Sequence, residues 1–470
     1  MPAAGVSSAP ITPGGVPLIA LPVPSMAASP VSAPRLSLFR LAGPTIVGNL
    51  LLSLVHLAAI KIVAALGAEA VAAVIAADRI YMAIQLIIFS ITAGTTTMVA
   101  YAWGAQNPAE ADRVVKLSAA LCLGASLLLW VAIQWLATPM VAIFGLQGDI
   151  LTEAANYLKV LIYFNVFFSF LAVISAALRA AGDAITPVWV AAIGNVINIV
   201  LAYLFVYGAG PVPAMGIIGA AYAAGLSYAV VGAIFYWLWM RNRLLLKPQK
   251  QAFFDRDRMR RLVRIAVPAG LEQSIFNFSI IAFMWVVSLY GTEAFTAYGI
   301  GVNILSVSIV IGIGFSIATA TMAGQNLGAG RPDLAEQAAW RNLKVSFGIM
   351  AGLGLLIGVN ARLIGSFFIS DPIVLDYLVA LVVMVAIVQP MMSIEFTLGG
   401  ALRGAGDTRS PARIMFTGFA FGRLALTGVF YWLEMSVYWV YAALIADYII
   451  KCAMYLVIFR RGAWKSAYGG

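Results

Sequence analysis

The chain repeats itself at a fixed offset of 224 residues, and this repeat constrains the fold more than any other feature of the sequence. Four pairs of similar segments share the offset: 38–44 with 262–268, 66–70 with 290–294, 104–108 with 328–332, and 177–183 with 401–407. A constant spacing over four separate pairs indicates two halves that contain the same elements in the same order. The chain is therefore expected to fold as a duplicated structure.

The composition places both halves in a membrane. Hydrophobic residues make up 62% of the chain and charged residues only 10%, whereas an average soluble protein is about 25% charged. Runs of roughly 20 apolar residues, long enough to cross a bilayer, recur along the whole length. Twelve helices are predicted, at about 41–65, 79–103, 114–138, 155–178, 187–208, 216–240, 265–290, 300–326, 342–360, 376–402, 412–433 and 437–460.

These features predict an all-α integral membrane protein made of two six-helix lobes. Because six is even, both halves enter the membrane in the same direction, so the pseudo-two-fold axis runs along the membrane normal, as in transporters that rock two similar halves. A Pro/Ala-rich tail without the basic start of a signal peptide is expected to be disordered. We predict this cytoplasmic tail at 1–37, the N-lobe at 38–240 and a basic linker at 241–264. The C-lobe follows at 265–465, and a short final tail at 466–470.

The distribution of basic residues predicts the orientation. About 23 of the 29 Lys and Arg residues lie on the side of the termini, nine of them in the linker 241–264. Because cytoplasmic loops carry the excess of Lys and Arg, both termini and the linker are expected to be cytoplasmic, in a plasma (inner) membrane. A basic linker is also compatible with nucleic-acid binding, but topology and contact with anionic lipid explain it better, so no nucleic acid is expected as a partner.

The residues also argue against several function classes. The only histidine is His56, which leaves no zinc site of the HExxH type, and Cys122 and Cys452 lie alone within apolar runs, where we interpret them as packing residues. No phosphate-binding loop and no filter-like sequence is visible. We therefore expect neither an enzyme, a metal site nor a channel, and no cofactor besides a coupling ion, H⁺ or Na⁺.

Several motifs resemble those of the multidrug and toxic compound extrusion (MATE) family. They are the glycine-rich segments 324–332 and 402–408 with their copies at 104–108 and 178–183, the Asn195-Val196-Ile197-Asn198 motif, and the ending 459–464. The resemblance covers 38–465 and rests on the order, spacing and duplication of these motifs. It implies a twelve-helix fold and secondary export of amphipathic compounds, in which acidic residues bind protons or sodium.

Ionisable residues within the predicted helices are concentrated in the C-half. An ionised side chain inside a bilayer costs about 2.5–3.5 kcal/mol on insertion scales, so such residues are functional candidates. Glu272, Glu395 and Asp447 are the carboxylates available to Arg423, and we predict one buried network of these four, with Asp447 and Lys451 four residues apart. The resemblance implies ion coupling at these acids; a permanently paired structural network is the alternative.

The N-half departs from the family pattern. The resemblance implies aspartates at positions that are Ala59 and Ala202 in this chain. Helix one instead carries His56, one turn before Ala59, and Lys61 near its end. A histidine titrates near neutral pH and is a candidate proton site; a neutral, hydrogen-bonded histidine is the alternative. Lys61 is expected to extend towards water.

Candidate substrate contacts are aromatic and amide side chains within the helices, since aromatic faces attract organic cations. Many such side chains serve packing instead. The candidates are Tyr81, Gln85, Tyr163, Asn165, Asn195, Asn198, Gln273, Asn277, Trp285 and Asn303.

Two arginine–aspartate pairs end the repeated motifs. Arg179 and Asp183 are four residues apart, as are Arg403 and Asp407. Such spacing permits a local ion pair that holds helix ends together in one state. Helix capping combined with the positive-inside bias is the alternative interpretation.

Together with the resemblance, the sequence predicts a monomeric antiporter that exports amphipathic organic compounds, cationic ones among them, by alternating access in exchange for H⁺ or Na⁺. A flippase or exporter of a lipid-linked or specific secondary metabolite is the alternative. That function requires several cations in the cavity, whereas only Lys61 and Arg423 stand out within the helices of the two halves away from their ends.

Overall fold

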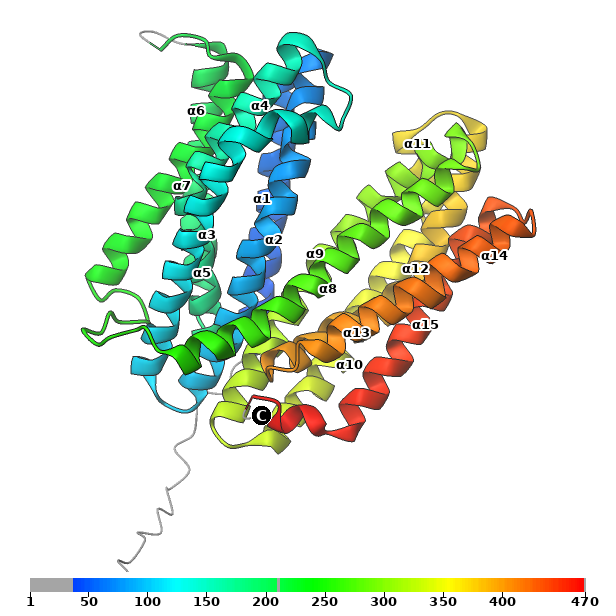
Figure 1. Cartoon of the computed structure of the whole chain (residues 1–470). Helices are drawn as coiled ribbons and strands as arrows, with labels where there is room; N and C mark the ends of the chain where they lie inside the picture. The colour runs from blue at the N-terminus through cyan, green and yellow to red at the C-terminus, as the bar shows by residue number, and fades with distance from the viewer. Residues whose placement is uncertain (1–36, 209–211, 469–470) are drawn as a thin grey trace, which may run out of the picture. The chain divides into compact units, whose positions relative to one another are not determined.

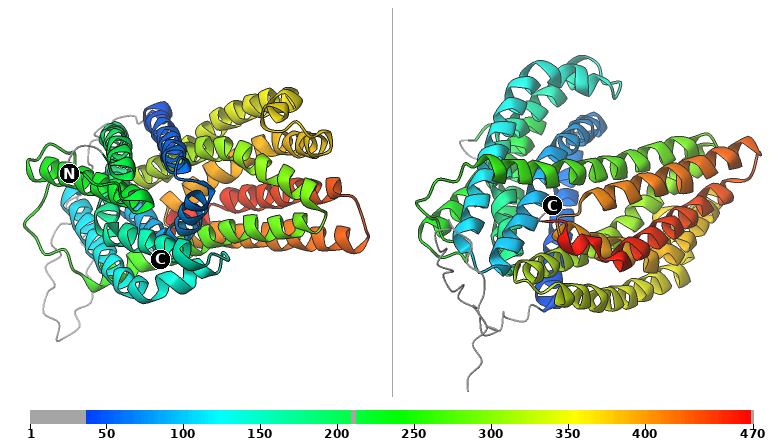
Figure 2. Two further views of the ribbon diagram at one scale, coloured as in Figure 1. Left: turned by 90° about the horizontal axis from the view of Figure 1, so that it is seen from above. Right: turned by 60° about the horizontal axis from the view of Figure 1, so that its bottom comes forward.

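The computed structural model describes residues 37–208 and 212–468. The tail predicted at 1–37 and the end of the tail predicted at 466–470 lie largely outside these residues. The described part of the chain is built from helices. In Figures 1 and 2, α1–α7 form one bundle and α8–α15 another.

The helix bounds follow the repeat. The N-half contains α1 (Leu38–Ala64), α2 (Ala68–Gly104), α3 (Pro108–Ala142), α4 (Gly148–Tyr163), α5 (Asn165–Ala181), α6 (Ile185–Tyr207) and α7 (Gly216–Met240). The C-half contains α8 (Arg256–Ser288), α9 (Thr292–Gly328), α10 (Pro332–Val359), α11 (Ala361–Phe368), α12 (Pro372–Gly404), α13 (Arg409–Thr417), the π-helical segment Gly418–Ala425, α14 (Leu426–Trp432) and α15 (Val437–Arg461), followed by the 3₁₀ turn Ala463–Ser466.

The described residues contain eleven helices long and apolar enough to span a membrane, and twelve spans if the bent pair α4 and α5 counts as one. The axes of α4 and α5 differ by 48°. The expected all-helical architecture is therefore confirmed. Some boundaries differ from the predicted ones: α2 begins at Ala68, which places Asp78 inside the helix, and α8 begins at Arg256, where Asp255 caps it by accepting the N–H of Asp257 at 3.0 Å.

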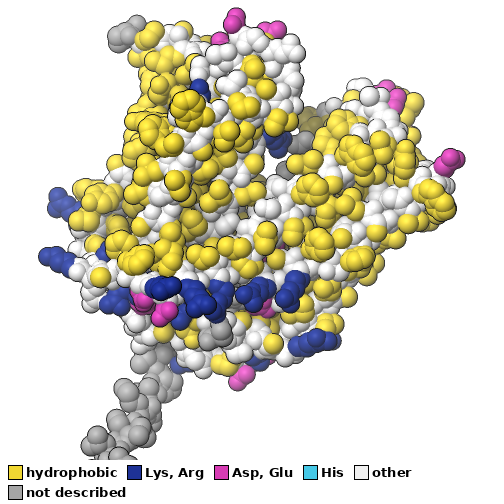
Figure 3. Space-filling model, viewed as in Figure 1, with side chains coloured by type: hydrophobic (Ala, Val, Ile, Leu, Met, Phe, Trp, Pro, Cys, Tyr) yellow, Lys and Arg dark blue, Asp and Glu magenta, His cyan; other side chains and the backbone are white. Residues whose placement is uncertain are grey.

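The surface is divided into zones. On the face in Figure 3, Lys and Arg side chains gather in a band near one end, Asp and Glu mark the opposite tips, and hydrophobic side chains cover the surface between them. Many large apolar side chains of the protein are exposed, including Trp135 at 82% and Phe367 at 85%, as expected for lipid contact. We call the end with residues 104–108, 241–255 and 328–331 the basic end, and the other the far end.

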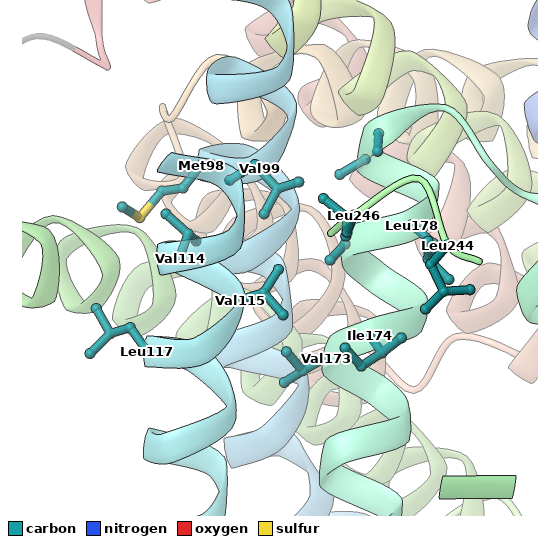
Figure 4. Close-up of a cluster of buried hydrophobic side chains, with 14 of the residues drawn as sticks. Met98, Val99, Val114, Val115, Leu117, Val173, Ile174, Leu178, Leu244 and Leu246 are labelled. Carbon is teal, nitrogen blue, oxygen red and sulfur yellow. The ribbon is translucent and has the colours of Figure 1, made fainter. Parts of the chain in front are cut away.

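The linker is anchored to the N-half. Leu244 and Leu246 are buried in the same apolar cluster as Val173, Ile174 and Leu178 (Figure 4). In the second half of the linker, the backbone N–H of Gln249 donates to the buried carboxylate of Asp112 at 2.9 Å. Arg258, at the start of α8, then forms a two-pronged ion pair with Glu110 of α3, at 2.6 and 2.8 Å. The linker thereby ties the start of the C-half to α3.

Two glycines related by the repeat bring α2 and α9 into backbone contact at the basic end. A side chain at Gly104 would collide with the backbone of Gln325, and one at Gly328 would collide with the carbonyl of Tyr101. Two hydrogen bonds between the halves obey the same symmetry. Thr97 donates to the carbonyl of Arg403 at 2.7 Å, and Thr321 donates to that of Arg179 at 3.3 Å. The two halves are therefore closed against each other at this end.

Replacing Gly104 with leucine is expected to open this contact, because the collision is with backbone atoms that cannot rotate away. The measurement is labelling by a membrane-impermeant maleimide of Ala100→Cys, a buried position, in a chain lacking Cys122 and Cys452. We expect labelling to rise several-fold in Gly104→Leu. Gly43→Leu is the matched control, since a Cβ at Gly43 meets nothing within 4 Å. Equal labelling in both variants would contradict the closure.

Candidate ion-coupling site

A chain of buried ion pairs crosses the C-half. Arg423 Nη2 lies 2.5 Å from Asp447 Oδ2, and Lys451 Nζ lies 3.2 Å from Asp447 Oδ1. The same Lys451 Nζ lies 3.7 Å from Glu395 Oε2. All four side chains are buried, and that of Asp447 is fully inaccessible. These contacts confirm that Arg423, Glu395 and Asp447 share one network, and they show that Lys451 links the two acids.

Local backbone geometry explains how Arg423 reaches Asp447. Arg423 lies in the π-helical segment, and such wide turns often mark functional positions in helices. Gly418 and Gly422 of this segment pack directly on α15, where a Cβ would lie 2.5 Å from Asp447 Oδ1 and 2.6 Å from Asp447 Cα, respectively. The absence of side chains at these two positions permits the close approach of the segment and α15. A cavity of about 40 Å³, room for a few waters, adjoins Arg423.

Glu272 belongs to a separate pair, which corrects the predicted network. Its Oε1 lies 2.5 Å from Arg403 Nη1, and Arg403 Nη2 donates to Ser316 Oγ at 2.6 Å. Arg423 is therefore not its partner. Arg423 was expected as a partner of Glu272 because both lie within membrane helices, but Glu272 on α8 points to Arg403 at the end of α12. Glu272 still interacts electrostatically with Glu395 and Lys451, so the two groups are neighbours.

Arg403 does not pair with Asp407, so the first of the two interpretations of this spacing is wrong. Asp407 instead caps α13, accepting the N–H of Ser410 at 3.0 Å and its hydroxyl at 2.6 Å. In the N-half, Asp183 caps α6 in the same way through the N–H groups of Ile185 and Thr186. The capping alternative holds for both aspartates, since a short acidic side chain next to a helix start satisfies free backbone N–H groups.

The C-half site is balanced in charge but not saturated in hydrogen bonds. Three carboxylates face three cations: Glu272, Glu395 and Asp447 against Arg403, Arg423 and Lys451. Within the described residues, the contacts of Glu395 Oε2 and Asp447 Oδ1 are the ion pairs to Lys451 Nζ at 3.7 and 3.2 Å, which leave lone pairs of both oxygens unused. Buried carboxylate oxygens with unused lone pairs are groups at which a proton or a hard cation gains a ligand. The described part of the chain holds no cluster of three or more His, Cys, Asp or Glu side chains suited to a metal ion.

The Glu272–Arg403 pair is more exposed to solvent than Asp447. The Arg403 side chain is 23% exposed and that of Glu272 10%, whereas Asp447 is at 0%. Glu272 is thus slightly more accessible than Asp447, although both residues are buried.

The N-half has no equivalent of the Glu272–Arg403 pair. Arg179 occupies the repeat position of Arg403, but Gly48 stands where Glu272 stands in the C-half. Within the described residues, Arg179 forms no ion pair, although its carbonyl accepts Thr321 as Arg403 accepts Thr97. Both copies therefore keep the hydrogen bond from a threonine to the arginine carbonyl across the halves, but only the C-half has a carboxylate that pairs with the arginine.

The buried polar groups of the N-half are mostly neutral. Gln85 donates to the Tyr81 hydroxyl at 3.0 Å, and Tyr81 lies 3.4 Å from the Asn165 carbonyl oxygen. Asn165 donates to Ser126 at 3.1 Å. These three substrate candidates are therefore buried and bonded to one another.

The other candidates lie nearer the surface. Asn195 and Asn198 on α6 are half-buried. Five are exposed: Tyr163, Gln273, Asn277, Trp285 and Asn303. Two of these, Asn277 and Asn303, donate to carbonyls one turn earlier in their own helices, at 2.8 and 2.9 Å.

Sequence reasoning missed Asp78, an acid that interacts electrostatically with the only histidine of the sequence. Tyr157 donates to Asp78 Oδ1 at 3.3 Å, and His56, exposed on α1, interacts with Asp78 electrostatically. The apolar residues of 68–78 could have revealed it, because they extend the second helix towards the N-terminus and so include Asp78 in it. Ala59 and Ala202 are confirmed as residues without a carboxylate, and Lys61 is exposed.

Comparisons with known proteins agree with the geometry. The MatE family model matches residues 44–204 and again 268–427, two matches whose starts are 224 residues apart. A probable multidrug resistance protein NorM of Thermotoga maritima is 28% identical over 438 residues, which cover 92% of this chain and 93% of that protein. An FAD transporter of Shewanella oneidensis is 28% identical over 350 residues, covering 73% and 76%.

Solved structures share the fold. A multidrug resistance MATE family transporter of the MOP superfamily in an outward-facing conformation superposes with a TM-score of 0.81 at 23% identity, covering 92% of this chain and 96% of that one. A MOP superfamily transporter from Pyrococcus furiosus gives 0.82 at 22% identity with the same coverage. The two-lobe helical fold, the duplicated family match and the transporter relatives lead to one conclusion: the chain belongs to the MatE family and is a multi-pass membrane transporter of small molecules, not an enzyme.

Proposed function

We propose that this transporter exports amphipathic organic compounds, cationic ones among them, in exchange for H⁺ or Na⁺. The basic end faces the cytoplasm of a cell whose inner membrane holds the protein as a monomer. Exchange uses no cofactor besides the ion. The multidrug resistance relative supports this substrate class, and the band of Lys and Arg at one end supports this orientation.

One residue carries the proposal, because Arg403 takes part in both the ion site and the closure. Its guanidinium holds Glu272 at 2.5 Å, while its backbone carbonyl accepts Thr97 of the other half at 2.7 Å. A proton or Na⁺ bound at Glu272 competes with the guanidinium for the same carboxylate. Arg403 is then released from α8, and the end of α12 loses one of the contacts that fix it beside α2.

Ion binding therefore favours the state in which the basic end is less tightly closed. An ion shifts a conformational equilibrium only through its different affinity for the two states, and here the difference is the presence or absence of the Arg403 pair. Substrate that prefers the opposite state is displaced in turn, since linkage between two ligands is reciprocal. Glu395, held only by Lys451 at 3.7 Å, is the second coupling candidate, and His56 with Asp78 is a third in the N-half.

The test is dye efflux from vesicles that contain the purified protein, with a pH gradient or a sodium gradient imposed separately. We expect one of the two gradients to drive efflux. Efflux that proceeds equally without any gradient would contradict antiport.

An exporter of one specific metabolite is the second candidate. The FAD transporter relative favours it, because that protein is 28% identical and covers 73% of this chain. Failure of several dyes under both gradients, with transport of a flavin nucleotide, would select this candidate over multidrug export.

A further inference from the structure

A cavity at the far end of the C-half is lined by aromatic rings and a single charge. It has a volume of about 650 Å³, within the range of small-molecule sites. The rings come from the end of α8, the start of α12, the end of α14 and the start of α15, which lie together at that end in Figure 1. We call it the tyrosine cavity; its side chains include Tyr290, Tyr377, Tyr431, Trp432, Glu434 and Tyr438.

The rings of the tyrosine cavity are arranged in two pairs. Tyr290 and Tyr431 meet edge to face, with centroids 5.8 Å apart at 76°. Tyr377 and Tyr438 lie 5.6 Å apart at 58°. Paired rings at steep angles present both faces and edges to the space between them, and a cation is attracted to an aromatic face by its quadrupole.

The charge and polarity of the walls favour a cation. Glu434 is the only ionisable side chain other than tyrosine among the lining residues, and within the described residues it forms no ion pair. Its backbone adopts a φ of +53°, held by Glu434 N–H to Tyr431 O at 3.1 Å and Met435 N–H to Phe430 O at 2.9 Å. The Tyr290 hydroxyl is buried and has no hydrogen-bond partner in the described part of the chain.

The repeat supplies an internal comparison. The N-half positions equivalent to Tyr290, Tyr377 and Tyr431 are Leu66, Glu153 and Tyr207. Tyr207 uses its hydroxyl within its own half, donating to the Ile62 carbonyl at 2.6 Å. The duplicated helices therefore fold with no ring at two of these three positions. The aromatic cluster is an addition of the C-half and not a requirement of the architecture.

We propose that the tyrosine cavity binds a small organic cation of the quaternary ammonium class, with the rings around the cation and Glu434 balancing its charge. None of the coupling carboxylates lines this cavity, so the site is distinct from them and does not depend on the proposed antiport. A cation held here occupies the far end of the transporter whichever ion drives transport.

The experiment is equilibrium binding of radiolabelled tetraethylammonium to the full-length protein in lipid nanodiscs at constant ionic strength. We expect saturable binding, weakened about tenfold by Glu434→Gln, which keeps the volume and removes the charge. Tyr431→Leu, which removes a ring face, is expected to weaken it similarly. Tyr290→Phe keeps the ring and is expected to retain most of the affinity.

Two matched controls locate the site. Trp135→Leu removes an exposed ring that does not line the cavity, and Glu336→Gln removes a C-half carboxylate that pairs with Lys465 at the basic end; neither is expected to change the affinity. Binding that is unaffected by Glu434→Gln and Tyr431→Leu, or that is lost in Glu336→Gln as well, would overturn the proposal. Absence of saturable binding would also overturn it and leave the rings as ordinary lipid-interface aromatics.

Discussion

Replacing Glu272 with glutamine is expected to abolish gradient-driven efflux while the protein still reaches the membrane in normal amounts. Glutamine keeps the size of the side chain and a carbonyl oxygen that accepts from Arg403. It carries no negative charge, so it neither takes up a proton near neutral pH nor pairs with a sodium ion as a carboxylate does. The loss is expected to be at least about tenfold in efflux rate, the change that corresponds to 1.4 kcal/mol of lost coupling. The measurement is dye efflux from vesicles under the active gradient.

Folding is expected to survive because Arg403 is not left isolated. Its guanidinium retains Ser316, and its side chain is 23% exposed, so water compensates for the lost charge. Glu336→Gln is the matched control: Glu336 is also a C-half glutamate paired with a cation, Lys465 at 2.6 Å, but it lies at the basic end away from the proposed site. Normal efflux in Glu272→Gln would remove Glu272 from the mechanism. Equal losses in both variants would point to a general effect of neutralising acids.

The fold could be read from the sequence because repeat and hydrophobicity are one-dimensional signals. A 224-residue offset survives in the helix bounds, as in α2 (Ala68–Gly104) and α9 (Thr292–Gly328), which both contain 37 residues. The ends of the helices were harder to predict, because a helix can continue through polar residues beyond the apolar run that identifies it. Asp78 was placed outside helix two for that reason, although α2 continues through it.

The partners of the buried charges could not be read in the same way. A sequence gives the depth of a charge in the membrane but not the direction in which it points. Depth alone made Glu272, Glu395 and Asp447 equal candidates as partners of Arg423, and the π-helical segment turns Arg423 to Asp447. The spacing of Arg403 and Asp407 allowed either a local ion pair or helix capping, and Asp407 caps α13 by accepting the N–H of Ser410. Pair identity depends on helix rotation and on which acids serve as caps.

Replacing Asp447 with asparagine is expected to destabilise the C-half strongly, by about 3–5 kcal/mol, the usual cost of removing one partner of a buried ion pair. Asp447 is inaccessible to solvent and faces both Arg423 and Lys451, so its loss leaves Arg423 without its ion-pair partner and Lys451 with Glu395 at 3.7 Å. The measurement is the midpoint of thermal unfolding in detergent, together with the yield of monodisperse protein. We expect a midpoint lower by several degrees and a lower yield.

The double variant Asp447→Asn with Arg423→Gln tests whether charge imbalance is the cause. It leaves Lys451 paired with Glu395, a neutral arrangement, so it is expected to recover much of the stability that the single variant loses. Residues in direct contact give non-additive effects in a double-mutant cycle, whereas independent residues give the sum. Additive losses would contradict the network. Recovery of stability without recovery of efflux would instead separate the anchoring function of Asp447 and Arg423 from the coupling proposed for Glu272.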